Sequence, residues 1–176
     1  MKIKRVLISV SDKTGIVKFA KSLQELGVEI ISTSGTSKLL KENGVKVVDI
    51  TDITNFPEML GGRVKTLNPK IFGGILYRRE NEQDNKQIAE QEIKPIDMVV
   101  VNLYPFAETA KNFNSVFEQE VIEKIDIGGP SLLRASAKNF KDVSVICNPQ
   151  DYTEILKELK ENKGEISLDT KKLLAS

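Results

Sequence analysis

Short apolar runs alternate with helical patterns through the first part of the chain. Val6–Val10 is a nearly continuous apolar run, which is typical of a parallel strand buried on both faces. Val28–Ile31 and Val45–Ile50 repeat this pattern, and the segment between them predicts a short helix that ends at Gly44. After the first run, apolar residues recur at helical spacing at Ile16, Val17, Phe19, Ala20, Leu23 and Leu26. Repeated units of strand, helix and strand predict a parallel sheet with right-handed crossovers.

The remainder of the chain continues this alternation. Glu80–Ile93 is very polar and predicts an exposed helix, whereas Met98–Leu103 is the most apolar of the predicted strands. Val143–Cys147 predicts a fifth strand, and Leu168–Ala175 predicts a last helix. The pattern as a whole predicts an α/β fold with a mainly parallel sheet.

Three helix starts carry sequence signals of their own. Ser115 and Glu118 have the spacing of a capping box. Pro130 is predicted at the first position of a helix, where its missing amide hydrogen is not needed. Asn148 is predicted to cap the next helix, with Pro149 at its first position.

Composition fits a single folded domain of moderate size. The chain has 176 residues, of which 40% are apolar and 29% are charged, and both values are typical of globular proteins. The longest apolar runs have strand length, so neither a membrane-spanning helix nor a signal peptide is predicted. Cys147 is the only cysteine, so no internal disulfide is possible. We expect a cytoplasmic protein.

Charge and residue types limit the chemistry that the chain can perform. The net charge is +1 and the cations are spread along the chain, which argues against a nucleic-acid partner. The sequence contains no histidine, so the commonest general base and the commonest metal ligand are both missing. Any catalysis must therefore use Lys, Asp, Glu or Tyr side chains, or backbone amides.

An irregular basic stretch runs from Gly61 to Gly74, with the sequence "GGRVKTLNPKIFGG". It shows neither a clear helical nor a clear strand period, and glycine pairs stand at both ends. Compact proteins seldom keep so long an irregular segment without a function. Its cations, Arg63, Lys65 and Lys70, indicate a negatively charged ligand.

Polar loops follow the predicted strands, at the edge of the sheet where ligands of open α/β folds bind. The loop "STSGT" begins at Ser32 and leads into a helix, a geometry that presents backbone amides and the helix dipole to an anion. Lys13, from the loop after the first strand, is expected to add a charge. The alternative for each loop is plain helix capping, but the pair of loops together favours a phosphate site. Neither a Walker A loop nor a dinucleotide fingerprint is present.

Two further segments are open to both structural and functional interpretations. In "DIGGPSLLRASAKN", Asp126 precedes a helix on which Arg134 and Lys138 lie one turn apart. On this segment alone, a capped surface helix with solvated charges is favoured over a ligand site. Tyr104, which precedes Pro105, fits core packing as well as a site role.

Taken together, these segments resemble a known family. "SVSDKTG", "STSGT", "GGRVKT.NPKI.GGIL", "VVVNLYPF" and "IDIGGPSLLRASAKN" are similar, in this order, to segments of the N-terminal IMP cyclohydrolase domain of the bifunctional purine-biosynthesis enzyme. The resemblance covers nearly the whole chain. It implies a methylglyoxal-synthase-like three-layer α/β fold, with helices on both faces of a central, mainly parallel sheet.

The resemblance also implies an activity and partners. The family is a hydrolase acting on a cyclic amidine: it closes the ring of 5-formamidoimidazole-4-carboxamide ribonucleotide to give IMP and water. It uses neither metal nor organic cofactor, and it forms a homodimer. The expected ligand is thus a purine nucleotide, with no nucleic acid and no membrane partner. The chemistry needs a base for the carboxamide nitrogen, an acid for the departing oxygen, and groups that stabilise negative charge on the formyl oxygen.

Site residues follow from the resemblance, motif by motif. The implied catalytic group consists of Lys65, Tyr104, Asp126 and Lys138. Asp126 is the candidate base and Lys138 the candidate acid or oxyanion partner, while Lys65 and Tyr104 would orient the formyl group. The 5′-phosphate would be held by Ser11, Lys13, Ser32, Ser34, Gly35 and Thr36. The rest of the nucleotide would contact Arg63, Thr66, Asn102, Ile127, Gly128 and Gly129.

The chain departs from the family pattern in two ways. Asn68, Phe72 and Phe140 stand where the family usually has histidine. Residues 1–164 would form the cyclohydrolase domain, whereas residues 165–176 would begin a connecting helix toward a formyltransferase domain that this chain lacks. We therefore expect no formyltransferase activity from these 176 residues.

Two alternatives remain within the same fold. A regulatory nucleotide-binding module of the kind found in carbamoyl-phosphate synthetases would have similar phosphate loops but would not need the four implied catalytic residues. Methylglyoxal synthase uses a histidine, which this sequence lacks.

Overall fold

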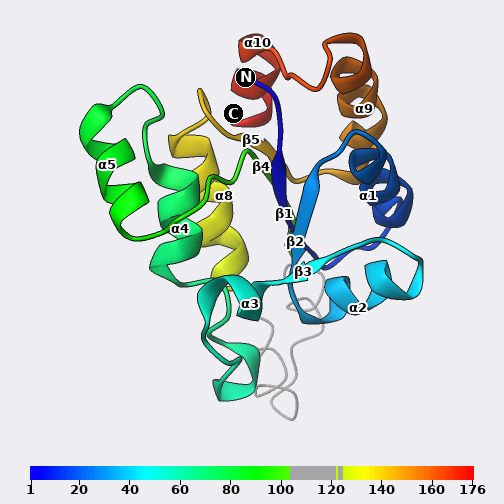
Figure 1. The fold of residues 1–176 in the computed structure, drawn as a ribbon. Helices are drawn as coiled ribbons and strands as arrows, with labels where there is room; N and C mark the ends of the chain where they lie inside the picture. Colours follow the sequence, from blue (N-terminus) through cyan, green and yellow to red (C-terminus); the bar gives the residue numbers. More distant parts are fainter. Residues whose placement is uncertain (104–121, 123–124) are drawn as a thin grey trace.

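Five parallel strands form one sheet at the centre of the molecule (Figure 1). The computed structural model describes residues 1–103, 122 and 125–176. The strands are β1 (Arg5–Val10), β2 (Glu29–Ser32), β3 (Val48–Asp49), β4 (Met98–Asn102) and β5 (Ser144–Ile146). Their order is β3-β2-β1-β4-β5, and all neighbouring pairs are parallel. The predicted α/β fold is confirmed.

Helices cover both faces of this sheet. The α-helices are α1 (Ile16–Glu25), α2 (Ser34–Glu42), α3 (Ile50–Thr54), α4 (Pro69–Leu76), α5 (Glu82–Glu90), α8 (Gly128–Lys138), α9 (Tyr152–Glu161) and α10 (Leu168–Leu174). Two short 3₁₀ helices are η1 (Leu60–Gly62) and η3 (Pro149–Asp151). Figure 1 shows α4 and α8 on one side of the strands and α1, α2 and α9 on the other. Among the described helices, none is long and apolar enough to cross a bilayer.

The two faces of the sheet bury separate apolar clusters, as the period of two along a strand requires. Val6, Ile8 and Val10 of β1 belong to the cluster that contains Phe19 of α1. Leu7, between them, belongs to the opposite cluster, which includes residues of α4 and α8. A strand buried on both faces explains why β1 has a nearly continuous apolar sequence.

The third strand is shorter than predicted. The apolar run Val45–Ile50 predicts a strand of six residues, but only Val48–Asp49 pairs with β2. The amide of Val45 donates instead to the carbonyl of Leu40 at 3.0 Å, so the start of the run closes the end of α2. Ile50 is already the first residue of α3.

The stretch from Gly61 to Gly74 is only partly irregular, so this prediction was half wrong. Its second half forms α4, which begins after Asn68. A Cβ on Gly74 would lie 2.6 Å from the carbonyl oxygen of Lys94, so glycine allows α4 to pack closely against the chain before β4. Gly73 and Gly74 have low helix propensity, which explains why the helix was not predicted from the sequence.

The signals at helix starts have mixed outcomes. Asn148 accepts a hydrogen bond from the amide of Gln150 at 3.0 Å, which confirms the predicted cap. Pro130 is the third residue of α8 rather than the first. The predicted capping box at Ser115 and Glu118 lies outside the described residues.

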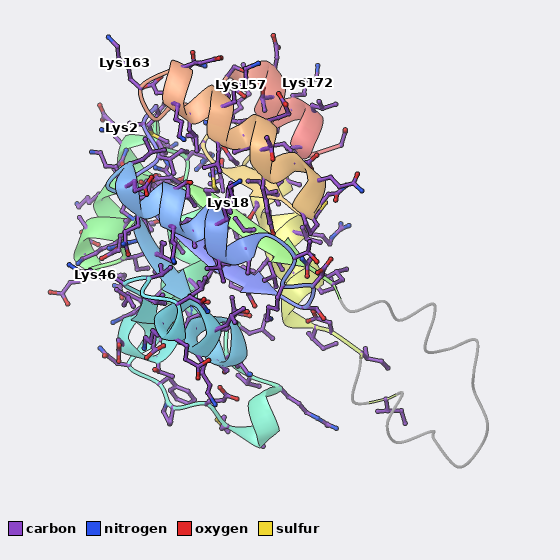
Figure 2. All side chains as sticks on the ribbon, turned by 90° about the vertical axis from the view of Figure 1, so that its right-hand side faces the viewer. Lys2, Lys18, Lys46, Lys157, Lys163 and Lys172 are labelled. Carbon is purple, nitrogen blue, oxygen red and sulfur yellow. The ribbon has the colours of Figure 1, made fainter. Side chains whose placement is uncertain are left out.

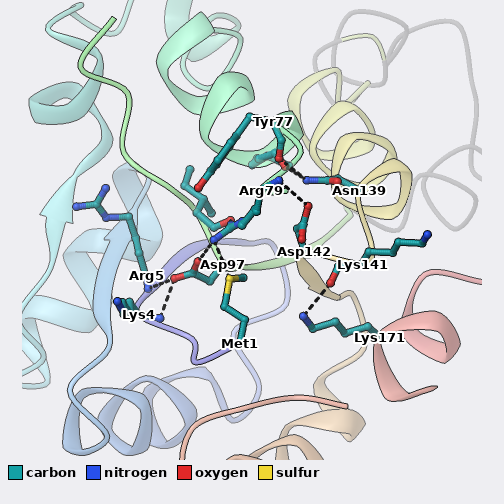
Figure 3. Close-up of polar contacts among 12 residues, drawn as sticks. Met1, Lys4, Arg5, Tyr77, Arg79, Asp97, Asn139, Lys141, Asp142 and Lys171 are labelled. Atoms are coloured by element: carbon teal, nitrogen blue, oxygen red, sulfur yellow. Dashed lines mark hydrogen bonds and ion pairs between the residues drawn. The ribbon is translucent and has the colours of Figure 1, made fainter. Parts of the chain in front are cut away.

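A polar cluster closes the amino edge of the sheet, near the chain termini (Figure 3). Asp97 is 3% exposed and pairs with Arg79, with 2.5 Å between Oδ1 and Nη1. Its Oδ2 accepts hydrogen bonds from the amides of Lys4 at 2.7 Å and Arg5 at 2.8 Å. The Asp97 carboxylate, which lies just before β4, therefore connects the start of β1 to Arg79.

The last residues pack on the same domain. Ile166 belongs to the core cluster that contains Phe19. Lys171 of α10 is buried, and its Nζ donates to the carbonyl of Lys141 at 3.2 Å. The segment 165–176, predicted to begin a connecting helix, thus packs against the sheet domain here.

Candidate functional site

A cavity of about 590 Å³ opens at the carboxyl edge of the sheet. Its walls come from the ends of β1 and β4, the start of α2, the segment after η1 and the start of α8. Many of the predicted site residues line it: Ser11, Arg63, Lys65, Thr66, Asn102, Asp126, Ile127, Gly128 and Gly129. The edge at which ligands bind in open α/β sheets therefore carries most of the predicted nucleotide site.

The start of α2 offers open backbone amides at this edge. Thr33 is the N-cap residue, but its hydroxyl makes no capping bond and lies instead 2.9 Å from Ser9 Oγ. Ser34 and Gly35 are exposed, and a Cβ on Gly35 would meet no atom within 4 Å. Uncapped amides and open space at a helix N-terminus are the features that an anion site needs.

Five of the six predicted phosphate residues do not line the cavity: Lys13, Ser32, Ser34, Gly35 and Thr36. Lys13 is half-buried, and its Nζ donates to Thr36 Oγ1 at 3.0 Å and to the carbonyl of Val10. Burial lowers the pKa of Lys13, an effect that the charge of Asp12 partly opposes. The ammonium thus joins the loop after β1 to α2 and adds positive potential there.

Ser32 has a structural role in this state. Its side chain is fully buried, and its Oγ donates to the carbonyl of Ile8 at 2.7 Å. The hydroxyl is therefore engaged between β2 and β1 and does not face the cavity. Its predicted phosphate contact rests on the resemblance alone.

Asn102 shapes the loop that follows β1. Its Oδ1 accepts from the amides of Ser11 at 2.6 Å and Asp12 at 2.8 Å, and its Nδ2 donates to the carbonyl of Asp12 at 3.0 Å. Three hydrogen bonds across 90 residues of sequence fix this loop beside β4.

Asp126 lies at the N-terminus of α8. Its Oδ1 accepts a hydrogen bond from the amide of Gly129 at 2.8 Å, as a capping residue does. A Cβ on Gly129 would lie 2.4 Å from Asp126 Oδ2 and 2.6 Å from Leu103 Cδ2, so only glycine admits the carboxylate here. Asp126 therefore caps the start of α8 and also lines the cavity, and its catalytic role stays a prediction.

Lys65 faces the cavity and is paired on its other side. Its Nζ lies 3.0 Å from Glu58 Oε1 and donates to Ser34 Oγ at 3.0 Å. Ser34 Oγ in turn donates to Glu58 Oε2 at 2.5 Å. Glu58 was not predicted, because an exposed glutamate in an irregular segment leaves no sequence pattern.

Lys138, another predicted catalytic residue, does not line this cavity. Lys138 is the last residue of α8 and is exposed, whereas Asp126 precedes its first turn. Ten residues of helix separate Lys138 from Gly128, a distance of about 15 Å along the axis. Tyr104 lies outside the described residues.

The lysines on the face of the molecule formed by α1 and α9 are dispersed. Figure 2 shows Lys18 of α1 and Lys157 of α9 on one face, with other lysines spread widely around them. A groove of about 500 Å³ between α1 and α9 is lined by both residues and by Glu161. In the described part of the chain, no group of three acidic or cysteine side chains is arranged to hold a metal ion.

The positions that depart from the family pattern have structural roles. Asn68 caps α4, with its Oδ1 accepting from the amide of Lys70 at 2.9 Å, and it lines a smaller cavity of about 290 Å³. Phe72 packs against the core cluster on the α4 side, and Phe140 is half-buried.

We expect Asn68→His to leave turnover within a few-fold of the parent. The side chain caps α4 and does not line the larger cavity. Loss of an asparagine cap costs about 0.5–2 kcal/mol, so the thermal midpoint should fall slightly while activity persists. Steady-state kinetics and a thermal melt on one preparation measure both. A hundredfold change in turnover would contradict this assignment.

Comparisons with known proteins identify the family of the chain. Residues 15–131 match the MGS-like domain family, and residues 136–176 match the family described as AICARFT/IMPCHase bienzyme. The bifunctional purine biosynthesis protein PurH of Bacillus subtilis is 57% identical over 176 residues, which cover 100% of this chain and 34% of that protein. PurH of Persephonella marina is 56% identical over 172 residues, covering 98% and 33%.

A solved structure has the same fold. The crystal structure of ForH superposes with a TM-score of 0.86 at 37% identity, covering 98% of this chain and 90% of that one. The chain spans about a third of the length of the curated relatives it matches, and it aligns with their N-terminal part. The chain therefore belongs to the MGS-like domain family, in the branch formed by the N-terminal part of the bifunctional purine biosynthesis proteins.

Proposed function

We propose that this domain is an IMP cyclohydrolase, which closes the purine ring of 5-formamidoimidazole-4-carboxamide ribonucleotide and releases water. The observation that carries the proposal is the shared cavity. Lys65, Asp126 and the loop held by Asn102 all line it, and the open N-terminus of α2 stands beside it. An anionic nucleotide with its phosphate at α2 would place its base toward Asp126 and Lys65.

The chemistry suits these groups. Asp126 is the proposed base that takes a proton from the carboxamide nitrogen as this atom attacks the formyl carbon. Lys65 is the proposed cation that stabilises negative charge on the formyl oxygen. Both reacting groups belong to one substrate, so much of the rate enhancement comes from orientation in the cavity.

Lys138 enters this proposal only through a second copy of the chain. Within one chain, α8 keeps it about 15 Å from the end that carries Asp126. The homodimer that the resemblance implies would provide a second copy, whose Lys138 could serve a neighbouring cavity. Tyr104 remains a prediction from the resemblance.

A regulatory nucleotide-binding module is the second candidate. The hydrogen bond from Gly129 to Asp126 favours it, because capping alone would account for this carboxylate. Both candidates need a nucleotide in the cavity, but only the enzyme turns substrate over. Incubation with the formylated ribonucleotide, monitored by the absorbance of the hypoxanthine product, separates them. No product would reject the cyclohydrolase proposal.

We expect the double substitution Lys13→Ala and Ser34→Ala to weaken IMP binding at least about tenfold, since hydrogen bonds to charged groups contribute about 1.5–3 kcal/mol each. Lys13 connects the loop after β1 to α2, and Ser34 is the first residue of α2. Calorimetric titration with IMP measures the loss. Lys18→Ala is the matched control, because Lys18 is an exposed lysine on α1 and is absent from the cavity lining. Unchanged affinity in the double variant would show that the phosphate binds elsewhere.

A further inference from the structure

Glu58 occupies Ser34, which the proposed function assigns to the nucleotide phosphate, and Lys65, which it assigns to the formyl oxygen. One carboxylate oxygen accepts from Ser34 Oγ at the first residue of α2, and the other pairs with Lys65 Nζ at 3.0 Å. Lys65 Nζ also donates to Ser34 Oγ, so the three side chains form a closed triangle. An anion of the protein thus stands at the helix N-terminus where an anion of the ligand is expected.

The hydrogen bonds to Glu58 favour the ionised form of its carboxylate. The hydrogen bond from Ser34, and then that from Lys65, lower the pKa of Glu58 from its ordinary value. The carboxylate is therefore ionised at neutral pH. A phosphate that approaches the same amides meets a like charge, and like charges at close range oppose binding.

Glu58 lies in the exposed segment 56–60, which buries little apolar surface. Phe56, Met59 and Leu60 on this segment are all exposed, so few apolar contacts hold it. Among the described residues, one isolated β-bridge, between Met59 and Val64, pairs this segment with the chain that follows it. Movement of Glu58 away from α2 would therefore cost little buried apolar surface.

We propose that Glu58 is a built-in competitor of the nucleotide phosphate, which holds Ser34 and Lys65 until a phosphate displaces it. This inference rests on the proposed function and adds a specificity-determining residue to it. A ligand with a phosphate gains the amides of α2 and Ser34, whereas a neutral nucleoside cannot displace the carboxylate. Displacement also leaves the Lys65 ammonium without its carboxylate partner, and the cavity beside it then holds the anionic substrate.

The test compares IMP with inosine, which lacks the phosphate, by calorimetric titration of the 176-residue chain. Glu58→Gln keeps the size and an acceptor for Ser34 but removes the competing charge. We expect this variant to bind IMP about five- to tenfold more tightly, because a partly exposed charge at short range is only partly screened. Its affinity for inosine should not change.

Glu42→Gln is the matched control. Glu42 is the last residue of α2, is exposed, and lies 4.0 Å from Lys38, so its substitution removes the same charge at the far end of the same helix. Its IMP affinity should equal that of the parent. Equal gains in the two variants would make the effect a general one of net charge and would overturn the inference.

The remaining outcomes are also decisive. If the parent binds IMP and Glu58→Gln binds it equally or more weakly, Glu58 supports the site and does not compete, and the proposed function stands. If inosine affinity rises as much as IMP affinity, the phosphate is not the displaced partner and the inference fails. If neither protein binds IMP at millimolar concentration, the nucleotide site itself is rejected, and the competitor with it.

Discussion

Replacement of Asp126 by asparagine is expected to lower kcat by about 10²–10⁴, the usual consequence of removing a general base. Affinity for IMP should change far less, because binding of the product requires no proton abstraction and the proposed phosphate site is at α2. The folded state should be nearly as stable as before. The loss of the base can be separated from a loss of stability in this variant, because asparagine retains the oxygen that accepts from the amide of Gly129 at 2.8 Å.

Asp126→Ala is the informative companion. It removes the acceptor as well as the base, so it should lower kcat equally and also destabilise the start of α8 by about 1 kcal/mol. Turnover, IMP affinity and thermal midpoint, measured on one preparation of each variant, separate the two roles. Near-normal kcat in Asp126→Asn would leave the residue as a cap only. A fall in affinity as large as the fall in kcat would make it a binding residue.

The sequence predicts the central strands and their polar ends well, for a physical reason. Strands β1 and β4 are buried on both faces, so nearly every residue in them is apolar. At their carboxyl ends the loops must bind ligands or water, so the change to polar residues is abrupt. This is why Ser11 and Asn102 could be placed at one edge from the sequence alone.

Other features depend on tertiary contacts that leave no local pattern. Gly74 of α4 allows close packing against the carbonyl of Lys94, and the adjacent glycines give the segment a low helix propensity, so the helix was missed in the sequence. Glu58 reaches Ser34 across 24 residues of sequence, and no spacing rule connects them. The resemblance names Lys138, but only the length of α8 reveals that one chain cannot bring it to Asp126.

The largest effect on stability is expected at the other edge of the sheet, at the ion pair of Arg79 and Asp97 (Figure 3). Arg79 Nη2 also donates to the carbonyl of Ile96 at 2.9 Å, while its buried Nε has no hydrogen-bond partner within the described residues. A buried charge that loses its partner is strongly destabilising. Asp97→Asn should therefore cost about 3 kcal/mol, which lowers Tm by roughly 6–12 °C in a chain of this size.

The matched control is the pair of the exposed Arg78 and the partly buried Asp84, with 2.8 Å between Nη2 and Oδ1. Asp84→Asn removes the same charge from a guanidinium that water can solvate, so its Tm should fall much less. A fall as large as that of Asp97→Asn would show that burial is not the cause. Thermal melts of both variants in one buffer make this comparison.

A double-mutant cycle tests whether the loss belongs to the pair. Arg79→Met leaves Asp97 with only the amides of Lys4 and Arg5, so it too should destabilise the fold. The double variant with Asp97→Asn should be more stable than the sum of the single losses predicts, by about 1–3 kcal/mol, because no unpaired charge then remains buried. Strictly additive losses would show that the two groups act independently.

The pair lies at the amino edge and the cavity at the carboxyl edge, so kcat of the folded fraction should equal that of the parent in all three variants. A loss of kcat without unfolding would instead connect this cluster to the site.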